Sequence, residues 1–407
     1  MSKEDVHVEK FDPKEFVKKQ TEAIRKTIGK ERALIAVSGG VDSSTCAVLA
    51  HRAVGDNLIC IMLDDAFMRE GEPEKVSQLL SQPPLNLPMR VVNARDRFLC
   101  AMKSLRDAEE KRKVFRETFY KVLGETAKKE ECSVLVQGTI AADIKETMSG
   151  IKTQHNVLER MGFDPQKKFG FKVVEPLVSL YKEQVRMVAR CLGIPKEISE
   201  RQPFPGPGLS VRVVGEINVD KLEALKKATK IAEEKLASLN PSQYFAVIVD
   251  NVETLQQSSR RHIQEKVARA LNIPARNISV KIFLDKATGM KGGHRVYGNI
   301  ACLKIQTANG KIHRPSFEVL KSLQARVAMD NPSLSRLFYL INESKQKQPY
   351  AVALRAIRTV DFLTAEVCDI PWNTLNETAE KILETCSNVA EVCYDVTPKP
   401  PATVEME

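Results

Sequence analysis

The stretch that decides the fold is residues 34–50, LIAVSGGVDSSTCAVLA. It opens with a continuous apolar run, which is typical of a strand buried in a parallel sheet. The pair Gly39-Gly40 follows, and the next residues have helical spacing. A strand joined to a helix through glycines surrounds an anion with backbone N–H groups and the positive end of a helix dipole. We therefore predict a phosphate-binding turn, although the lysine of the P-loop motif G-x-x-x-x-G-K-S/T is absent.

The same alternation of apolar runs and helical segments continues to about residue 193. Buried strands are predicted at NLICIML, MRVVNA, SVLVQGT and FKVVEPL, and helices over residues 97–129 and at KEQVRMVARCLG. Strands that alternate with helices indicate an α/β domain with a doubly wound parallel sheet, which binds ligands at the carboxyl ends of its strands. A polar lead-in helix is predicted within residues 1–30.

The segment RQPFPGPGLSVR interrupts this pattern, because its prolines and glycines exclude a helix and predict a fixed loop or domain junction. Beyond it, helices over 219–238, 316–329 and 374–386 are mixed with strands, which is typical of an α+β domain. We expect three parts: a lead-in (1–30), the α/β domain (31–212) and the α+β domain (213–407). A faint repeat relates RVYGNIACLKI-helix-LSRLFYLI to QPYAVALRAIR-helix-VAEVCYDV, although chance similarity explains it nearly as well.

The composition is that of an ordinary globular chain of 407 residues, 43% hydrophobic and 28% charged. No apolar run approaches the ~20 residues that span a bilayer, and the N-terminal residues lack a signal-peptide core. We therefore expect a cytoplasmic protein without a membrane partner. The net charge of +10 suits anionic ligands, but its basic residues are interspersed with acidic ones, so no nucleic-acid partner is expected. The nine cysteines form no C-x-x-C pair, which argues for buried thiols over a zinc site.

The glycine turn matches S-G-G-x-D-S, the motif of the ATP-pyrophosphatase (PP-loop) family, whose fold is similar to that of the adenine nucleotide α-hydrolases. In that family the loop grips the β- and γ-phosphates, which leave together as pyrophosphate. The enzyme adenylates a carbonyl oxygen, and a nitrogen or sulfur nucleophile then displaces AMP.

Other stretches resemble one branch of this family, the GMP synthetases. RQPFPGPGLSVRVVGEI is similar to that branch's x-P-F-P-G-P-G-L signature, and CYDVTPKPPATVEME to its K-P-P-A-T-x-E-x-E ending. AIRTVDFLTAEV and GIKTQHN resemble the branch's D-F-M-T-A segment and its I-K-S-H-H-N lid. The chain departs from the branch pattern at residues 141–143, where A-A-D replaces Y-P-D, and within the lid.

This resemblance implies a C–N ligase of GMP (purine) biosynthesis that converts XMP, ATP and ammonia to GMP, AMP and pyrophosphate, with ATP and Mg2+ as cofactors. It also implies a homodimer built by the enlarged region 213–407. Ammonia would come from a separate glutamine amidotransferase subunit, because the chain leaves no room for such a domain ahead of residue 31.

The resemblance also assigns roles by position. Asp42, Lys152 and His155 would be catalytic, with Asp42 the ligand of the metal. The pyrophosphate loop and the nucleotide site would comprise Ser38, Gly39, Gly40, Val41, Asp42, Ser43, Ser44, Asp64, Gly138 and Thr139. The XMP site would comprise Asp143, Arg201, Lys399, Thr403 and Glu405, with Lys399 at the phosphate.

Three alternatives stay open. An adenylating enzyme with another acceptor is motivated by the altered lid and Y-P-D loop. A paralogue that binds nucleotide without turnover is disfavoured by the intact loop. An RNA-modifying member of the PP-loop family is motivated by positive charge alone.

Overall fold

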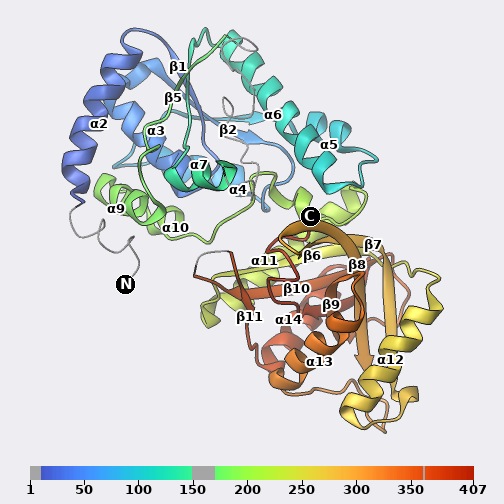
Figure 1. Ribbon diagram of the computed structural model, residues 1–407. Helices are drawn as coiled ribbons and strands as arrows, with labels where there is room; N and C mark the ends of the chain where they lie inside the picture. Colours follow the sequence, from blue (N-terminus) through green and yellow to red (C-terminus); the bar gives the residue numbers. More distant parts are fainter. Residues whose placement is uncertain (1–10, 149–169, 361–362) are drawn as a thin grey trace. The chain divides into compact units, whose positions relative to one another are not determined.

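The computed structural model describes residues 11–148, 170–360 and 363–407. It divides into two compact units (Figure 1). The first takes in the chain up to Phe98 and Phe115–Gly206, and the second Leu99–Val114 and Pro207–Glu407. The division after Gly206 falls inside the loop RQPFPGPGLSVR, which the sequence analysis predicted to be a junction. The alternation of strands and helices gave no sign that residues 99–114 belong with the second unit.

The first unit is built on a parallel sheet of five strands in the order β3-β2-β1-β4-β5. The strands are β1 (Ala33–Ala36), β2 (Leu58–Asp64), β3 (Met89–Asn93), β4 (Val134–Val136) and β5 (Lys172–Val174). The chain moves outward from β1 to β2 and β3 and then returns to place β4 on the other side of β1. The carboxyl ends of β1 and β4 therefore flank the topological switch point, where such sheets bind ligands.

Both faces of this sheet are covered, which explains why its strands are continuously apolar. Ala33 and Ile35 face one hydrophobic cluster, to which α2 (Pro13–Ile28), α3 (Val41–Val54), α4 (Glu72–Ser81) and α9 (Lys182–Leu192) contribute. Leu34 faces a second cluster, to which α6 (Ala108–Lys129) contributes Tyr120 and Leu123. The predicted doubly wound α/β fold is confirmed.

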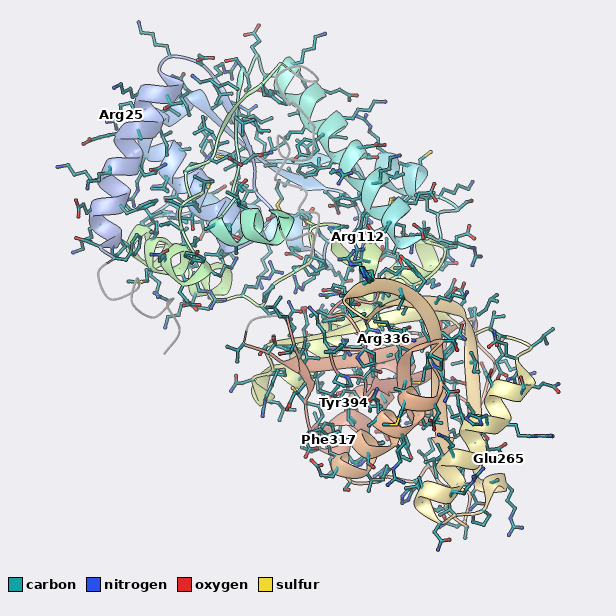
Figure 2. The ribbon with its side chains drawn as sticks, viewed as in Figure 1. Arg25, Arg112, Glu265, Phe317, Arg336 and Tyr394 are labelled. Atoms are coloured by element: carbon teal, nitrogen blue, oxygen red, sulfur yellow. The ribbon has the colours of Figure 1, made fainter. Side chains whose placement is uncertain are left out.

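The lead-in helix is confirmed as α2, and it is an integral part of this core. Ile24 and Ile28 are buried in the same cluster as β1. Arg25, labelled in Figure 2, donates from Nε to the carbonyl of Ala53 at the end of α3, 3.0 Å away. These contacts attach α2 to the helix that follows the glycine turn.

The prediction of one helix over residues 97–129 was wrong. Two helices, α5 (Arg95–Met102) and α6, are separated by a turn in which Ser104 has a φ of 63°. A left-handed residue cannot continue an α-helix. The sequence analysis also missed α4, and it gave no residue ranges for the short α7 (Ala141–Met148) and α10 (Lys196–Ser199).

The second unit carries a mixed sheet in the order β11-β10-β12-β9-β8-β7, with β6 paired to β10. Its strands are β6 (Gln243–Asp250), β7 (Ile278–Lys291), β8 (His294–Ile305), β9 (Leu334–Glu343), β10 (Tyr350–Arg358), β11 (Glu366–Val367) and β12 (Val389–Asp395). Its helices are α11 (Val219–Leu236), α12 (Gln257–Leu271), α13 (Phe317–Asp330) and α14 (Trp372–Thr385). The predicted α+β character is confirmed, although α12 had not been predicted.

The predicted internal repeat is present in the topology. β8, α13 and β9 form one unit in which β8 and β9 are parallel, and β10, α14 and β12 form another in which β10 and β12 are parallel. Each is extended by an antiparallel strand, β7 beside β8 and β6 beside β10. The antiparallel pairing of β12 with β9 joins the two halves. This is the pairing expected for halves related by a local two-fold axis. The half that contains β7–β9 is inserted into the other between β6 and β10.

Candidate active site

The turn between β1 and α3 has a backbone that requires glycine. Gly39 has a φ of +77°, a conformation that L side chains rarely adopt, and a Cβ there would lie 2.8 Å from Cγ2 of Val76. Gly40 is the N-cap of α3 and is extended, with a φ of −79° and a ψ of 156°. The two glycines thus turn the chain sharply while keeping its backbone uncovered.

Two serine hydroxyls hold the turn in shape. The Oγ atoms of Ser38 and Ser43 are 3.0 Å apart, and Ser43 Oγ also accepts from the backbone N–H of Ser38 at 3.1 Å. Ser43 in turn donates to the carbonyl of Gly40, 3.2 Å away. The serines of the motif are therefore in place to preorganise the loop before any phosphate binds.

The first amides of α3 form the anion-binding end of the turn. The first backbone bond within the helix runs from the N–H of Ser44 to the carbonyl of Gly40, so the N–H groups of Val41, Asp42 and Ser43 have no acceptor within it. Val41 contributes its backbone, because its side chain is buried in the core. These amides and the helix dipole favour an anion here.

Asp42 has one engaged and one unsatisfied oxygen. Its Oδ2 pairs with Nζ of Lys182, the first residue of α9, at 2.7 Å. Its Oδ1 is buried without a hydrogen-bond partner, as is Oγ of Ser44. Lys182 was missed by the sequence analysis, because its only sign was a lysine at the start of a predicted helix. Buried oxygens without partners next to an anion-binding turn are suited to coordinate a cation.

Gly138 closes the site from β4. A Cβ on Gly138 would lie 3.0 Å from the backbone nitrogen of Ser43, so only glycine allows the chain after β4 to pass so close to α3. Thr139 is buried, and its Oγ1 donates to Oε1 of Glu175 at 2.5 Å. Gly138, which follows β4, therefore meets the loop that follows β1, and the contacts of Gly138 and Thr139 with a nucleotide stay predictions.

Arg201 lies beside the same loop. Its Nη1 is 3.4 Å from the position that a Cβ of Gly39 would occupy. Its guanidinium pairs with Oε1 of the buried Glu72 at 2.5 Å. Arg69 also contacts Glu72, at 3.6 Å, and stacks over the ring of Phe204, 4.2 Å from its centroid. The first half of RQPFPGPG is thus attached to the first unit, with its arginine next to the glycine turn.

Two other candidates are carboxylates, one at the end of β2 and one in the first turn of α7. Asp64, the last residue of β2, accepts from the N–H of Ala66 at 3.1 Å and lies 3.5 Å from Nη1 of Arg95. Asp143 accepts from the N–H of Ile140 at 3.0 Å, at the start of α7. Both carboxylates are near the carboxyl edge of the sheet, and their contacts with nucleotides remain predictions.

Asp65 should make stability depend on pH. Its carboxylate is 4% exposed, and burial, followed by the charges of Asp64 and Glu72, raises its pKa to about 7 against the hydrogen bond from Phe67. The pKa of Asp65 is higher in the folded protein than in the unfolded chain, so folding favours the protonated carboxyl. The stability of the fold is therefore undiminished by Asp65 below about pH 4 and falls as pH rises through about 7, where the buried group becomes charged. We expect Asp65→Asn to raise the free energy of unfolding at pH 8.5 by on the order of 2–4 kcal/mol.

The gain should shrink steadily as the pH is lowered to 5, because the wild-type carboxyl is then protonated. Denaturant titrations at several pH values measure it. Asp56→Asn, at an exposed position of the turn before β2, is the control and should leave the profile unchanged. Parallel pH profiles for wild type and Asp65→Asn would disprove this role of Asp65.

The remaining described candidates lie in the second unit. Lys399 forms an antiparallel bridge with Ala365, with N···O distances of 2.8 and 3.0 Å. Glu405 accepts two hydrogen bonds from the buried Arg212, at 2.8 and 2.9 Å. The hydroxyl of Thr403 accepts from Arg336 at 2.9 Å. Thr403 and Glu405 therefore help to hold the C-terminal segment, and their contact with XMP remains a prediction.

Lys152 and His155 lie outside the described residues. Within the described ranges no group of three or more His, Cys, Asp or Glu side chains is placed to hold a metal ion. Mg2+ is commonly bound by one or two carboxylates together with substrate phosphates, so a single Asp42 is consistent with such a site. None of the helices in the described part of the chain is both long and apolar enough to cross a membrane.

Most of the cysteines are the buried thiols that the sequence predicted, whereas Cys100 and Cys191 are exposed. Burial, and next the charge of Asp42, raise the pKa of the Cys46 thiol well above its usual range, which argues against a nucleophilic thiolate beside the loop. All nine thiols are free, and six are buried: Cys46, Cys60, Cys302, Cys368, Cys386 and Cys393.

A parallel sheet with the S-G-G-x-D-S turn at its switch point is the arrangement that the resemblance to the ATP pyrophosphatases implies. Two family models agree with this class: NAD synthase matches residues 14–260, and GMP synthase C terminal domain matches residues 341–406.

Comparison with curated proteins shows to which family within this class the chain belongs. The chain is 42% identical over 400 residues to a protein of Sulfurisphaera tokodaii, and the match covers 98% of this chain and 100% of the relative. It is 42% identical over 397 residues to one of Saccharolobus solfataricus and 38% over 404 residues to one of Methanopyrus kandleri, with the same coverage. All three are named as the same subunit of a glutamine-hydrolyzing GMP synthase. The chain belongs to this family of GMP synthase subunits.

Proposed function

We propose that this chain adenylates XMP with ATP and aminates the product with ammonia, giving GMP, AMP and pyrophosphate. The observation that carries the proposal is the glycine turn at the switch point, whose uncovered amides adjoin Asp42 and Lys182. Membership of the family of GMP synthase subunits supports XMP as the acceptor.

The chemistry has two balanced steps. The oxygen on C2 of XMP attacks the α-phosphorus of ATP, the bond from that phosphorus to the β-phosphate oxygen breaks, and pyrophosphate leaves. Ammonia then adds to C2, AMP departs with the former C2 oxygen, and a proton is released. The amides of Val41, Asp42 and Ser43 and the ammonium group of Lys182 would stabilise the negative charge that grows on the leaving pyrophosphate.

Mg2+ fits the residues present. Oδ1 of Asp42 and Oγ of Ser44 are buried oxygens without partners, and they lie next to the anion-binding amides. We propose that Asp42 holds the ion together with the phosphates. When bound, the ion would neutralise phosphate charge and make pyrophosphate a better leaving group.

An acceptor screen tests this function against its alternatives. Purified protein with ATP, Mg2+ and ammonium should release AMP only when XMP is present. AMP release with another acceptor, such as a carboxylic acid, and not with XMP would establish a different adenylating enzyme. No release of AMP or pyrophosphate with any acceptor, even with candidate glutaminases present, would indicate a nucleotide-binding paralogue.

We propose a separate glutamine amidotransferase subunit as the source of ammonia. The relatives support this, because each is named as one subunit of a glutamine-hydrolyzing enzyme. Free ammonium should replace the amidotransferase at mildly alkaline pH. We also propose a cytoplasmic location, because free thiols throughout the chain suit a reducing compartment and ATP is available there.

A homodimer is proposed from the family resemblance. Sedimentation equilibrium should give the mass of two chains, and a single-chain mass at micromolar concentration would contradict the proposal. A monomer is the serious alternative, because β12 and β9 already join two equivalent halves of the sheet within one chain.

A further inference from the structure

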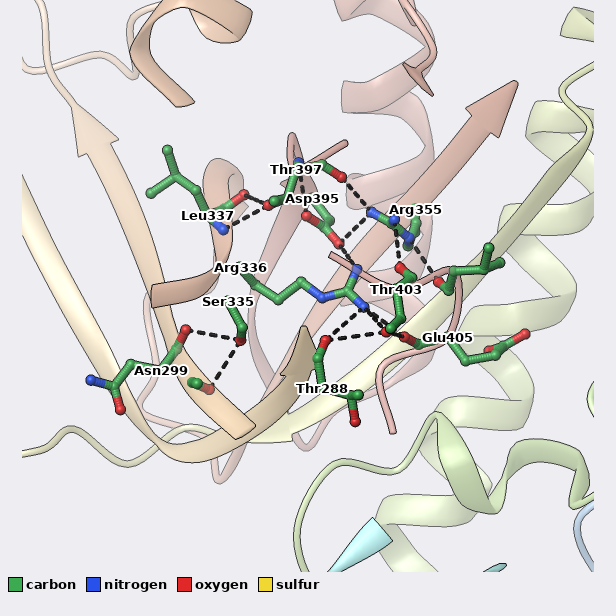
Figure 3. A network of polar contacts seen from close by, with 12 residues as sticks. Thr288, Asn299, Ser335, Arg336, Leu337, Arg355, Asp395, Thr397, Thr403 and Glu405 are labelled. Atoms are coloured by element: carbon green, nitrogen blue, oxygen red, sulfur yellow. Dashed lines mark hydrogen bonds and ion pairs between the residues drawn. The ribbon is translucent and has the colours of Figure 1, made fainter. Parts of the chain in front are cut away.

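Three charged side chains are buried together in the second unit (Figure 3). Arg336 on β9 and Arg355 on β10 share the carboxylate of Asp395 at the end of β12, with Nη1 atoms 3.0 and 2.7 Å from Oδ2. None of the three side chains has exposed surface. Two guanidinium groups against one carboxylate are costly to bury unless their remaining N–H groups find acceptors.

Most of those acceptors lie in the C-terminal segment, residues 396–407, although Arg336 also contacts the carbonyl of Thr288 on β7 at 3.4 Å and its Nε has no partner. Arg355 donates from Nη1 to the carbonyl of Thr397 at 3.0 Å, and from Nη2 to that of Thr403 at 2.8 Å. Its Nε donates to the carbonyl of Val404 at 2.9 Å. One planar guanidinium therefore binds both ends of the loop of residues 398–402, which we call the lysine loop because it contains Lys399.

Arg336 fixes the chain just after this loop. Its Nη2 donates to Oγ1 of Thr403 at 2.9 Å and to the carbonyl of Glu405 at 2.6 Å. The middle of the loop is held from the other side, because Lys399 pairs with Ala365 and Met290 N–H donates to the carbonyl of Pro401 at 2.6 Å. The loop is thus defined by buried, directional contacts at its base.

We propose that Arg355 is a positioning residue for the acceptor: it closes the base of the lysine loop and thereby fixes where Lys399 presents its charge. This inference rests on the proposed function for the identity of the acceptor. A planar group with several donors can define the positions of three backbone oxygens at once, which an apolar side chain of similar volume could not. The same contacts leave the ATP loop of the first unit untouched, so the two substrates should respond differently to their loss.

Two variants test the proposal. Arg355→Lys keeps the charge but loses the planar fork. Gly289→Ala keeps both arginines but places a Cβ 2.9 Å from the carbonyl oxygen of Pro401 and 3.1 Å from Cβ of Ser335, so it displaces the lysine loop by contact with Pro401. Each should raise the KM for XMP by about tenfold or more and change the KM for ATP by less than about twofold. If Arg355→Lys does not fold, Gly289→Ala carries the test.

Hydrogen exchange of the Lys399 and Ala402 amides supplies a readout that needs no catalysis. Both amides are bonded in the folded protein, to the carbonyls of Ala365 and Pro398. Either variant should speed their exchange by about tenfold or more, because the loop opens more often. Ile263→Ala is the control, since Ile263 is buried on α12 away from the loop and its loss lowers stability without touching the loop.

The result expected is a raised KM for XMP together with faster exchange in the loop variants, and neither in Ile263→Ala. A loop variant with faster exchange but an unchanged KM for XMP would overturn the proposal, as would a control that raises this KM equally. If the wild type forms no GMP, the proposed function fails. In that case hydrogen exchange is the only remaining test of whether Arg355 positions the lysine loop. Unchanged exchange of the Lys399 and Ala402 amides in both loop variants would overturn that role.

Discussion

Asp42→Asn should lower the rate of pyrophosphate release from ATP by about 100- to 1000-fold, the loss that follows removal of one preorganised electrostatic group. The carboxylate stands in the first turn of α3, with Oδ2 on Lys182 and Oδ1 buried without a partner. Asparagine keeps the size of the side chain but removes the charge that a cation would bind. The Mg2+ concentration for half-maximal activity should rise as well.

A coupled pyrophosphate assay over a range of Mg2+ concentrations measures both effects. Asp220→Asn is the matched control, because Asp220 is an exposed acid in the first turn of another helix, α11. It should leave the rate unchanged. Unchanged turnover in Asp42→Asn, in a protein with a wild-type unfolding transition, would rule out the proposed metal role.

Lys399→Ala should raise the KM for XMP by about 10- to 100-fold, since a hydrogen bond to a charged group contributes about 1.5–3 kcal/mol. The lysine loop stays closed in this variant, because Arg355 contacts backbone carbonyls and not the lysine side chain. The KM for ATP should change by less than about twofold, because the pyrophosphate loop lies in the first unit.

Initial rates with each substrate varied in turn separate the two constants. Lys345→Ala, which removes an exposed lysine from the same unit, controls for a general loss of positive charge. If Lys399→Ala raised both KM values equally, the assignment of this lysine to XMP would be wrong.

The glycine turn could be predicted in detail from the sequence, because the contacts that shape it are local. A glycine pair directly after a buried strand permits the positive φ of Gly39 that this turn needs, and the serines that shape the turn are neighbours in the chain. The order of strands along the chain followed from the alternation of apolar runs with helices.

Contacts between distant residues could not be predicted in the same way. Lys182 reaches Asp42 across 140 positions of sequence, and Glu72 reaches Arg201 from a helix that had not been predicted. The helix breaks near Ser104 in a stretch that contains no proline or glycine, so no helix-breaking residue indicates the break in the sequence. Residues 99–114 join the second unit through contacts such as that of Lys111 with the carbonyl of Val213, which no local pattern reveals.

The C-terminal segment was predictable from its own sequence, whereas the contacts that hold it were not. Its prolines excluded a helix, and its resemblance to the GMP synthetase ending pointed to Lys399. The buried arginines that hold it come from β9 and β10, where they stand within apolar runs and are read most simply as strand residues facing solvent. Only the pairing of those strands with β12 brings both to Asp395.

The central claim is that the oxygen of XMP is activated by transfer of AMP. The most direct measurement uses XMP labelled with 18O at the C2 oxygen, together with ATP, Mg2+ and ammonium, and determines the mass of the AMP formed. The account predicts one 18O atom in each AMP and an equal amount of GMP. AMP that is formed in step with GMP but carries no 18O would contradict it.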